Sequence, residues 1–273
     1  MKLATIRTPG GTTAVRIDED TAVELSGATD VGALLDEPRW RERAQTAEGP
    51  RRRAAEVDYA PVVPRPSKVI CAGLNYRSHI AEMGLEMPTH PTLFAKFAET
   101  LLGPYDALEL PAASDQVDWE VELGVVVGRP VRHADEAEAE AAIAGYVVAN
   151  DISMRDWQTR TSEWLQGKAF EASTPVGPWL VTPDEVDGAR DLAIWCEVDG
   201  RTMQRSRTSD LLFRPAALVA YVSQFVTLRP GDLILTGTPG GVGLAQDPPI
   251  FLRSGQVVRV GIEGLGEMRT PCR

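Results

Sequence analysis

Hydrophobic and polar residues alternate over short stretches at the start of the chain, and this pattern predicts a small leading module. Strands are expected near residues 3–6, 13–17 and 22–25, followed by an arginine-rich polar helix. Prolines recur in segment 61–66, and proline removes a backbone donor and restricts the residue before it, so this segment indicates a linker. We therefore expect a small N-terminal α/β domain over residues 1–62 and a larger domain over 63–273.

Beyond residue 68 the pattern changes to short apolar runs separated by glycine and proline, which is typical of a mostly β domain with short helices. Strands are expected at 68–73, 145–150, 232–236 and 257–262. Apolar residues at helical spacing predict a packed helix over 211–226, and an Ala- and Glu-rich stretch predicts a solvent-facing helix over 134–144. The expected fold class is α+β, mostly β.

Composition and net charge narrow the classes of protein to which this chain can belong. The 273 residues are 43% hydrophobic and 25% charged, as in ordinary globular proteins, and no apolar run is long enough for a membrane helix. The N-terminus lacks the apolar core of a signal peptide, so a cytoplasmic protein is expected. A net charge of -11 disfavours nucleic acid and anionic membranes as partners. Three scattered cysteines argue against a disulfide framework.

Two acids, Glu120 and Glu122, interrupt an apolar run that ends in three valines. On a strand they point to the same side, and two like charges side by side cost energy unless a cation lies between them. A third acid, Asp151, directly follows another apolar strand. Three carboxylates without nearby Cys or His favour Mg²⁺, Mn²⁺ or Ca²⁺ over zinc. The pair alone fits equally well on the wet face of an edge strand.

His79 and Glu82 are three residues apart, which on a helix brings both side chains to one face. A carboxylate that orients an imidazole fixes its tautomer and raises its basicity, as a general base requires. Without further support, an incidental surface ion pair explains this spacing as well.

The order and spacing of seven motifs resemble the fumarylacetoacetate hydrolase family over residues 68 to 269. The motifs are GLNY at 73–76 with His79 and Glu82 after it, PTLFAK at 91–96, WEVEL at 119–123, NDISMRD at 150–156, GK at 167–168, PVGP at 175–178 and GDLILTGTPGGVG at 231–243.

The resemblance implies a mixed β-roll of that family's C-terminal type, preceded by a small N-terminal domain, in a homodimer. It also implies Mg²⁺ or Mn²⁺ as cofactor and a small-molecule 2-oxo or β-diketo acid that chelates the ion through its carboxylate and keto oxygens. The site residues that it implies are His79, Glu82 and Lys168 for catalysis, Arg155, Gln158 and Thr238 for substrate binding, and Glu120, Glu122 and Asp151 for the metal.

Two positions depart from the family pattern. Glu171 stands where the family usually has Asp, three residues after Lys168, and the longer side chain is expected to move Lys168 or reshape the pocket. Trp119 stands where tyrosine is commoner. The exact substrate is therefore left open.

The function expected on these grounds is a metal-dependent carbon–carbon bond hydrolase that acts on ketonic substances. It would cleave a β-diketo acid of the acylpyruvate or fumarylpyruvate type through a metal-bound enolate, with water activated by His79 and Glu82. The same enolate forms in an oxaloacetate decarboxylase and in a 2-oxo acid tautomerase or isomerase, which are the alternatives. A catalytically silent metal-binding protein is disfavoured, because every implied catalytic group is present.

Overall fold

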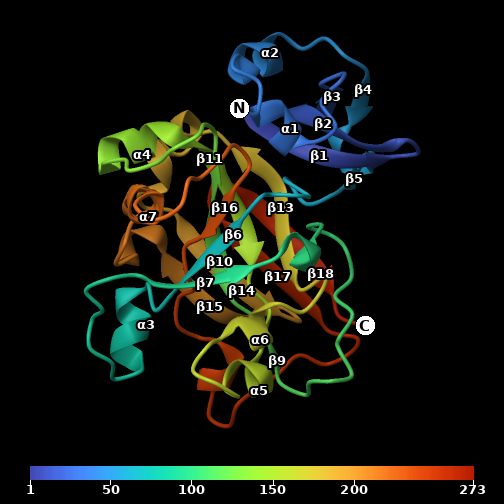
Figure 1. Cartoon of the computed structure of the whole chain (residues 1–273). Helices are drawn as coiled ribbons and strands as arrows, with labels where there is room; N and C mark the ends of the chain where they lie inside the picture. Colours follow the sequence, from blue (N-terminus) through green and yellow to red (C-terminus); the bar gives the residue numbers. More distant parts are fainter.

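The computed structural model describes residues 1–273 except for the side chain of Glu82. A mixed sheet runs through the molecule in the order β4-β3-β2-β1-β13-β11-β10-β16-β6-β7, with β5 on β1 and β8 on β13 (Figure 1). A second sheet has the order β15-β14-β17-β18, and β9 pairs with β12. This mostly β architecture confirms the expected fold class.

The N-terminal elements agree with the alternating pattern that predicted them. They are β1 (Lys2–Thr8), β2 (Gly11–Asp18), β3 (Thr21–Glu24), α1 (Val31–Leu35), α2 (Trp40–Thr46), β4 (Arg51–Arg53) and β5 (Asp58–Tyr59). Leu3 of β1 pairs with Leu180 of β13, so these strands extend the main sheet. We retain the division into 1–62 and 63–273 as a proposal, with the two parts sharing one sheet.

The remaining elements follow in chain order. The strands are β6 (Val69–Gly73), β7 (Thr92–Lys96), β8 (Leu101–Leu102), β9 (Val117–Asp118), β10 (Val121–Val127), β11 (Ile143–Asn150), β12 (Ser153–Met154), β13 (Thr174–Val181), β14 (Ala193–Val198), β15 (Arg201–Arg207), β16 (Leu233–Leu235), β17 (Val257–Ile262) and β18 (Gly266–Pro271). The α-helices are α3 (Arg77–Glu82), α4 (Glu136–Ala142), α5 (Arg155–Gln158), α6 (Leu165–Lys168) and α7 (Pro215–Ser223). The 3-10 helices are Ala54–Glu56, Ala98–Thr100, Pro183–Glu185, Asp187–Ala189, Thr208–Asp210 and Gly243–Ala245.

Local sequence explains where the predicted helices begin. The helix expected over 134–144 is α4, and it starts after Asp135, whose carboxylate accepts from the Glu138 amide while the Glu138 side chain accepts from the Asp135 amide. The helix expected over 211–226 is the shorter α7, because Pro215 occupies its first position and disfavours helical geometry in the residue before it. No helix of the described residues is long and apolar enough to cross a membrane.

Strand β10 contributes side chains to the hydrophobic core from both of its faces. Val121, Leu123, Val125 and Val127 belong to one hydrophobic cluster, whereas Val126 belongs to another together with residues of β11 and β16. Because side chains alternate along a strand, Glu122 shares the face of Val126. β10 is also hydrogen-bonded on both edges, to β11 and β16, so an acid on this strand lies inside the protein.

Candidate active site

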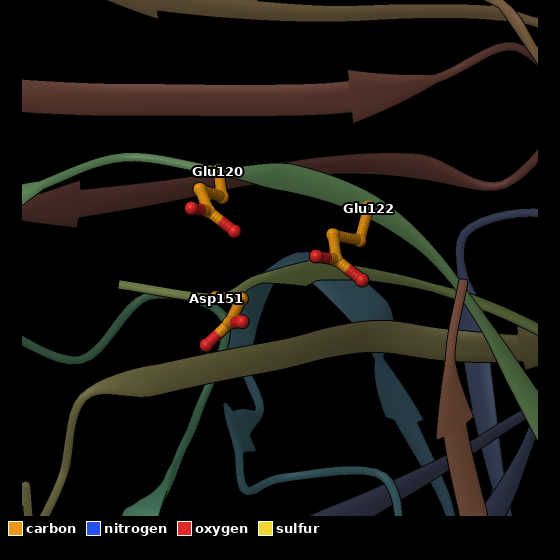
Figure 2. A group of neighbouring side chains, drawn as sticks. All are labelled: Glu120, Glu122 and Asp151. Atoms are coloured by element: carbon orange, nitrogen blue, oxygen red, sulfur yellow. The ribbon is translucent and has the colours of Figure 1, made fainter. Parts of the chain in front are cut away.

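Three carboxylates converge where β10 begins and β11 ends. Glu120 precedes β10, Glu122 lies within it, and Asp151 follows β11. The antiparallel register pairs Val121 with Asn150, and the Asp151 amide donates to the Glu120 carbonyl at 2.8 Å. One oxygen atom from each of the three carboxylates lies within 4.8 Å of the others (Figure 2). The grouping expected from the sequence is therefore present.

These three acids are buried, so they do not lie on the solvent-exposed face of an edge strand. Glu120, Glu122 and Asp151 are 7%, 1% and 0% exposed. Carboxylates removed from water at this depth need compensating charge.

Cationic side chains supply part of that charge. The Lys168 ammonium lies 2.8 Å from both Glu120 Oε2 and Asp151 Oδ2, and the Lys96 ammonium lies 2.5 Å from Asp151 Oδ1. Arg155 Nη1 lies 2.7 Å from Glu120 Oε1. Glu122 takes part in no ion pair within the part of the chain that the structure describes, and its Oε2 accepts from the Gly237 amide at 2.7 Å.

These partners shift the protonation equilibria in opposite directions. Burial and the neighbouring Asp151 and Glu120 carboxylates raise the pKa of Glu122 well above its ordinary value. Burial opposes the ionisation of Asp151, but the ammonium groups of Lys168 and Lys96 outweigh it, so the pKa of Asp151 is lowered. Burial also opposes the charge on Lys168, yet the carboxylates of Asp151 and Glu120 raise its pKa overall. Lys168 is therefore a protonated group at neutral pH.

This donor set fits a divalent cation with a preference for oxygen. The acids are buried, close together and all carboxylates, and Glu122 in particular lacks a cationic partner of its own among the described residues. A divalent ion between them would relieve the repulsion that raises the pKa of Glu122.

Glycine allows Lys168 to reach the acids. A Cβ on Gly167 would lie 2.4 Å from the Gln158 amide nitrogen and 2.5 Å from the Met154 carbonyl oxygen, so α6 packs against α5 more closely than any side chain at 167 would permit. Glu171 is exposed on the surface, and Lys168 keeps both of its ion pairs. The effect of Glu171 on Lys168 and on the pocket stays a prediction.

The acids face a cavity of about 520 Å³, within the usual range for small-molecule sites. Its polar lining includes Glu120, Glu122, His79, Arg155, Gln158, Lys168 and Thr238, and its apolar lining includes Leu74, Phe94, Trp164, Val242 and Leu244. Among the expected site residues whose side chains the structure describes, all line this cavity except Asp151, which is paired with Lys168.

The two expected general-base residues share helix α3. His79 is 8% exposed and lines the cavity. The Glu82 side chain lies outside the described residues, so its proposed contact with His79 stays a prediction. Figure 1 shows α3 at the opposite end of the molecule from the N-terminal strands.

The remaining two expected residues are held by specific hydrogen bonds. Gln158 Oε1 accepts from Arg155 Nη1 at 2.8 Å. The Thr238 hydroxyl donates to the Val121 carbonyl at 2.9 Å and accepts from Gln204 Nε2 at 2.8 Å.

Lys96 and Asp118 belong to the site but had no role assigned from the sequence. Lys96 closes the PTLFAK motif and Asp118 precedes Trp119, and both side chains are buried. The available signal was a charged residue at the end of an apolar strand, which is common on surfaces. Their positions depend on strand pairings between distant parts of the chain.

The fold places a cavity of small-molecule size beside three buried carboxylates, as in an enzyme active site. Residues 68–273 match the model of the fumarylacetoacetate hydrolase C-terminal domain, so the chain belongs to that family, whose members are hydrolases, isomerases or tautomerases.

Three similar proteins illustrate the family's range. The mitochondrial oxaloacetate tautomerase Fahd2a of Rattus norvegicus is 45% identical over 239 residues, covering 84% of this chain and 76% of the relative. The solved 5-carboxymethyl-2-hydroxymuconate delta-isomerase of Mycobacterium smegmatis has a TM-score of 0.83 and 35% identity, covering 100% of this chain and 99% of that one. The fumarylpyruvate hydrolase of Pseudomonas aeruginosa, solved with Mn²⁺ and pyruvate, has a TM-score of 0.68 and 34% identity, covering 75% and 88%.

Proposed function

We propose that this protein is a metal-dependent tautomerase that converts the enol form of a small 2-oxo diacid of the oxaloacetate type into the keto form. The observation that carries the proposal is the buried group of three carboxylates with Lys168 and Arg155 around it at the cavity. The 45% identity to an oxaloacetate tautomerase over 84% of the chain supports this choice over hydrolysis. The tautomerase, which the sequence left as an alternative to the hydrolase beside the decarboxylase, thereby becomes the first candidate.

Glu120, Glu122 and Asp151 would hold Mg²⁺ or Mn²⁺. When bound, the divalent ion supplies Lewis-acid charge that stabilises negative charge on the keto oxygen of a chelated 2-oxo acid. Lys168 is protonated and buried, so it would add a fixed positive charge near the keto oxygen. Such a preorganised charge stabilises the developing negative charge without reorganisation of the protein during the reaction. Arg155 and Gln158 would bind the substrate carboxylate, and Thr238 lines the same cavity.

His79 carries the proton in this proposal. Tautomerisation breaks the enol O–H bond and forms a C–H bond at the adjacent carbon, with no net change in protons or electrons. One imidazole suffices, because it accepts the proton at one stage and returns it at the next. No water has to be activated, which distinguishes this reaction from hydrolysis.

Carbon–carbon bond hydrolysis is the second candidate. It is favoured by the 34% identity to a fumarylpyruvate hydrolase and by a cavity with room for more than a four-carbon acid. His79, oriented by Glu82, would then deprotonate water instead of the substrate. The metal site and Lys168 would keep the same roles.

A substrate panel with product identification separates the candidates. With Mn²⁺ present, we expect the protein to accelerate the loss of the enol absorbance of oxaloacetate without releasing pyruvate. We expect kcat/KM for the cleavage of fumarylpyruvate or an acylpyruvate to be lower than kcat/KM for this tautomerisation by about tenfold or more. Faster cleavage of those acids than tautomerisation would make the protein a hydrolase. Pyruvate released from oxaloacetate would make it a decarboxylase.

A further inference from the structure

Asp118 is a fully buried carboxylate with four hydrogen-bond donors around it. It ends strand β9 and is 0% exposed. Its Oδ1 accepts from the Trp119 amide at 2.8 Å and the Gly243 amide at 2.7 Å, and its Oδ2 accepts from the Leu244 amide at 3.0 Å and Arg155 Nε at 2.8 Å. Asp118 does not line the cavity, so any effect that it has on a bound ligand must pass through these neighbours.

One neighbour is the guanidinium of Arg155. Its Nε faces Asp118, and its Nη1 faces both Glu120 Oε1 at 2.7 Å and Gln158 Oε1 at 2.8 Å. These contacts fix the plane of the guanidinium, because its donors form a rigid fork. The remaining nitrogen, Nη2, is buried and has no hydrogen-bond partner among the described residues. An unpaired buried donor of this kind is suited to a ligand oxygen.

The other neighbour is the glycine-rich wall of the cavity. Val242, Leu244 and Ala245 line it, and the amides of Gly243 and Leu244 both donate to Asp118. A Cβ on Gly243 would lie 2.0 Å from the Ile250 carbonyl oxygen and 2.8 Å from Asp118 Oδ1, so this segment is tightly seated. Asp118 Oδ2 therefore accepts hydrogen bonds both from the Leu244 amide of the cavity wall and from Arg155 Nε.

We propose that Asp118 is a positioning residue that sets the orientation of Arg155 relative to the cavity wall and so determines how tightly the substrate carboxylate binds. The proposal rests on the proposed function for the identity of the substrate. It predicts an effect on binding and little effect on the chemical step, because Asp118 touches neither the substrate nor the three metal-binding candidates.

The variant Asp118→Asn tests this role at saturating Mn²⁺. An amide keeps the shape but places an NH₂ group against donors whichever way it is turned, and it removes the charge that holds Nε. We expect KM for enol oxaloacetate to rise by about tenfold or more, with kcat changed by less than about threefold. The matched control is Asp232→Asn. Asp232 is also fully buried and accepts from the Ser67 hydroxyl and the Lys68 and Arg229 amides, but it lies outside the cavity. A comparable loss of thermal stability in both variants, with KM altered only in Asp118→Asn, supports the proposal.

A double-variant cycle tests whether the effect passes through Arg155. In an Arg155→Met background, Asp118→Asn should raise KM no further than about twofold. Additive effects on KM would overturn the proposal. If Asp118→Asn does not fold, Arg155→Lys takes its place: a lysine keeps the charge but cannot face Asp118 and Glu120 together, so KM should rise nearly as much as in Arg155→Met. A wild-type KM in Arg155→Lys would also overturn it.

Oxalate binding to the Mn²⁺-loaded protein separates this proposal from the proposed function. Calorimetry should give an oxalate Kd that rises by about tenfold in Asp118→Asn and stays unchanged in Asp232→Asn. If wild type binds oxalate but does not tautomerise oxaloacetate, the function fails and the positioning role is still decided by these affinities. An oxalate Kd unchanged in Asp118→Asn contradicts the positioning role whatever the reaction is.

Discussion

Glu122→Gln is expected to weaken Mn²⁺ binding by about tenfold or more while leaving the metal-free fold intact. Glu122 is the carboxylate without an ion-pair partner among the described residues, and its pKa is raised by burial and by Asp151 and Glu120. A raised pKa in a buried acid means that its charged form destabilises the metal-free protein near neutral pH. A neutral amide removes this cost, and its oxygen still accepts from the Gly237 amide.

Two measurements check this prediction. Calorimetric titration with Mn²⁺ should give the lower affinity, and thermal unfolding without metal should show a melting temperature at or above that of wild type. Asp232→Asn is the control, because it also removes a buried carboxylate but lies outside the cavity, and it should bind Mn²⁺ as wild type does. Wild-type Mn²⁺ affinity in Glu122→Gln would show that the three acids do not hold the ion.

His79→Ala is expected to lower kcat by roughly 10² to 10⁴, the usual contribution of a general acid or base, without changing Mn²⁺ affinity. His79 lines the cavity from α3, whereas the acids come from β10 and β11, so removing the imidazole leaves the metal-binding candidates in place. Added imidazole should restore part of the lost rate, because the deletion leaves space for it.

The matched control is His90→Ala. His90 is exposed and packs near Tyr221, outside the cavity, so its removal should leave kcat unchanged. An undiminished kcat in His79→Ala would refute the proton-carrying role. Equal losses in the two variants would point to a general effect on folding instead.

The acids of the site could be predicted because their signal is local. Two glutamates at alternate positions of an apolar strand share a face whatever the rest of the fold does. Their burial was not predictable from that segment. It follows from the pairing of β10 with β11 on one edge and with β16 on the other, and the β10–β16 pairs join residues more than 100 positions apart.

The position of Lys96, and the sheet that the N-terminal strands share with the rest of the chain, also depend on the pairing of strands that are far apart in sequence. Lys96 reaches Asp151 because β7 pairs with β6, and β6 in turn pairs with β16 next to β10. Likewise, Leu3 pairs with Leu180, and no local pattern near residue 3 indicates that partner. Short strands with similar composition are interchangeable at the level of sequence pattern, so their neighbours had to come from the structure.

The family resemblance supplied the roles of Lys168, Arg155 and Thr238, which spacing alone could not give. The structure adds the physical reasons for their positions. Lys168 depends on a glycine that lets α6 approach α5, and Arg155 depends on Asp118. Neither dependence has a signal in a single sequence.

Catalysis is expected to require a divalent cation at Glu120, Glu122 and Asp151. The test is to follow the loss of enol oxaloacetate absorbance while Mn²⁺ is titrated into the metal-free wild-type protein. We predict that the metal-free protein is inactive and that the rate rises until one Mn²⁺ is bound per chain, since the described residues contain one such group of acids. Full activity in the metal-free protein, or none at saturating Mn²⁺, would contradict this account.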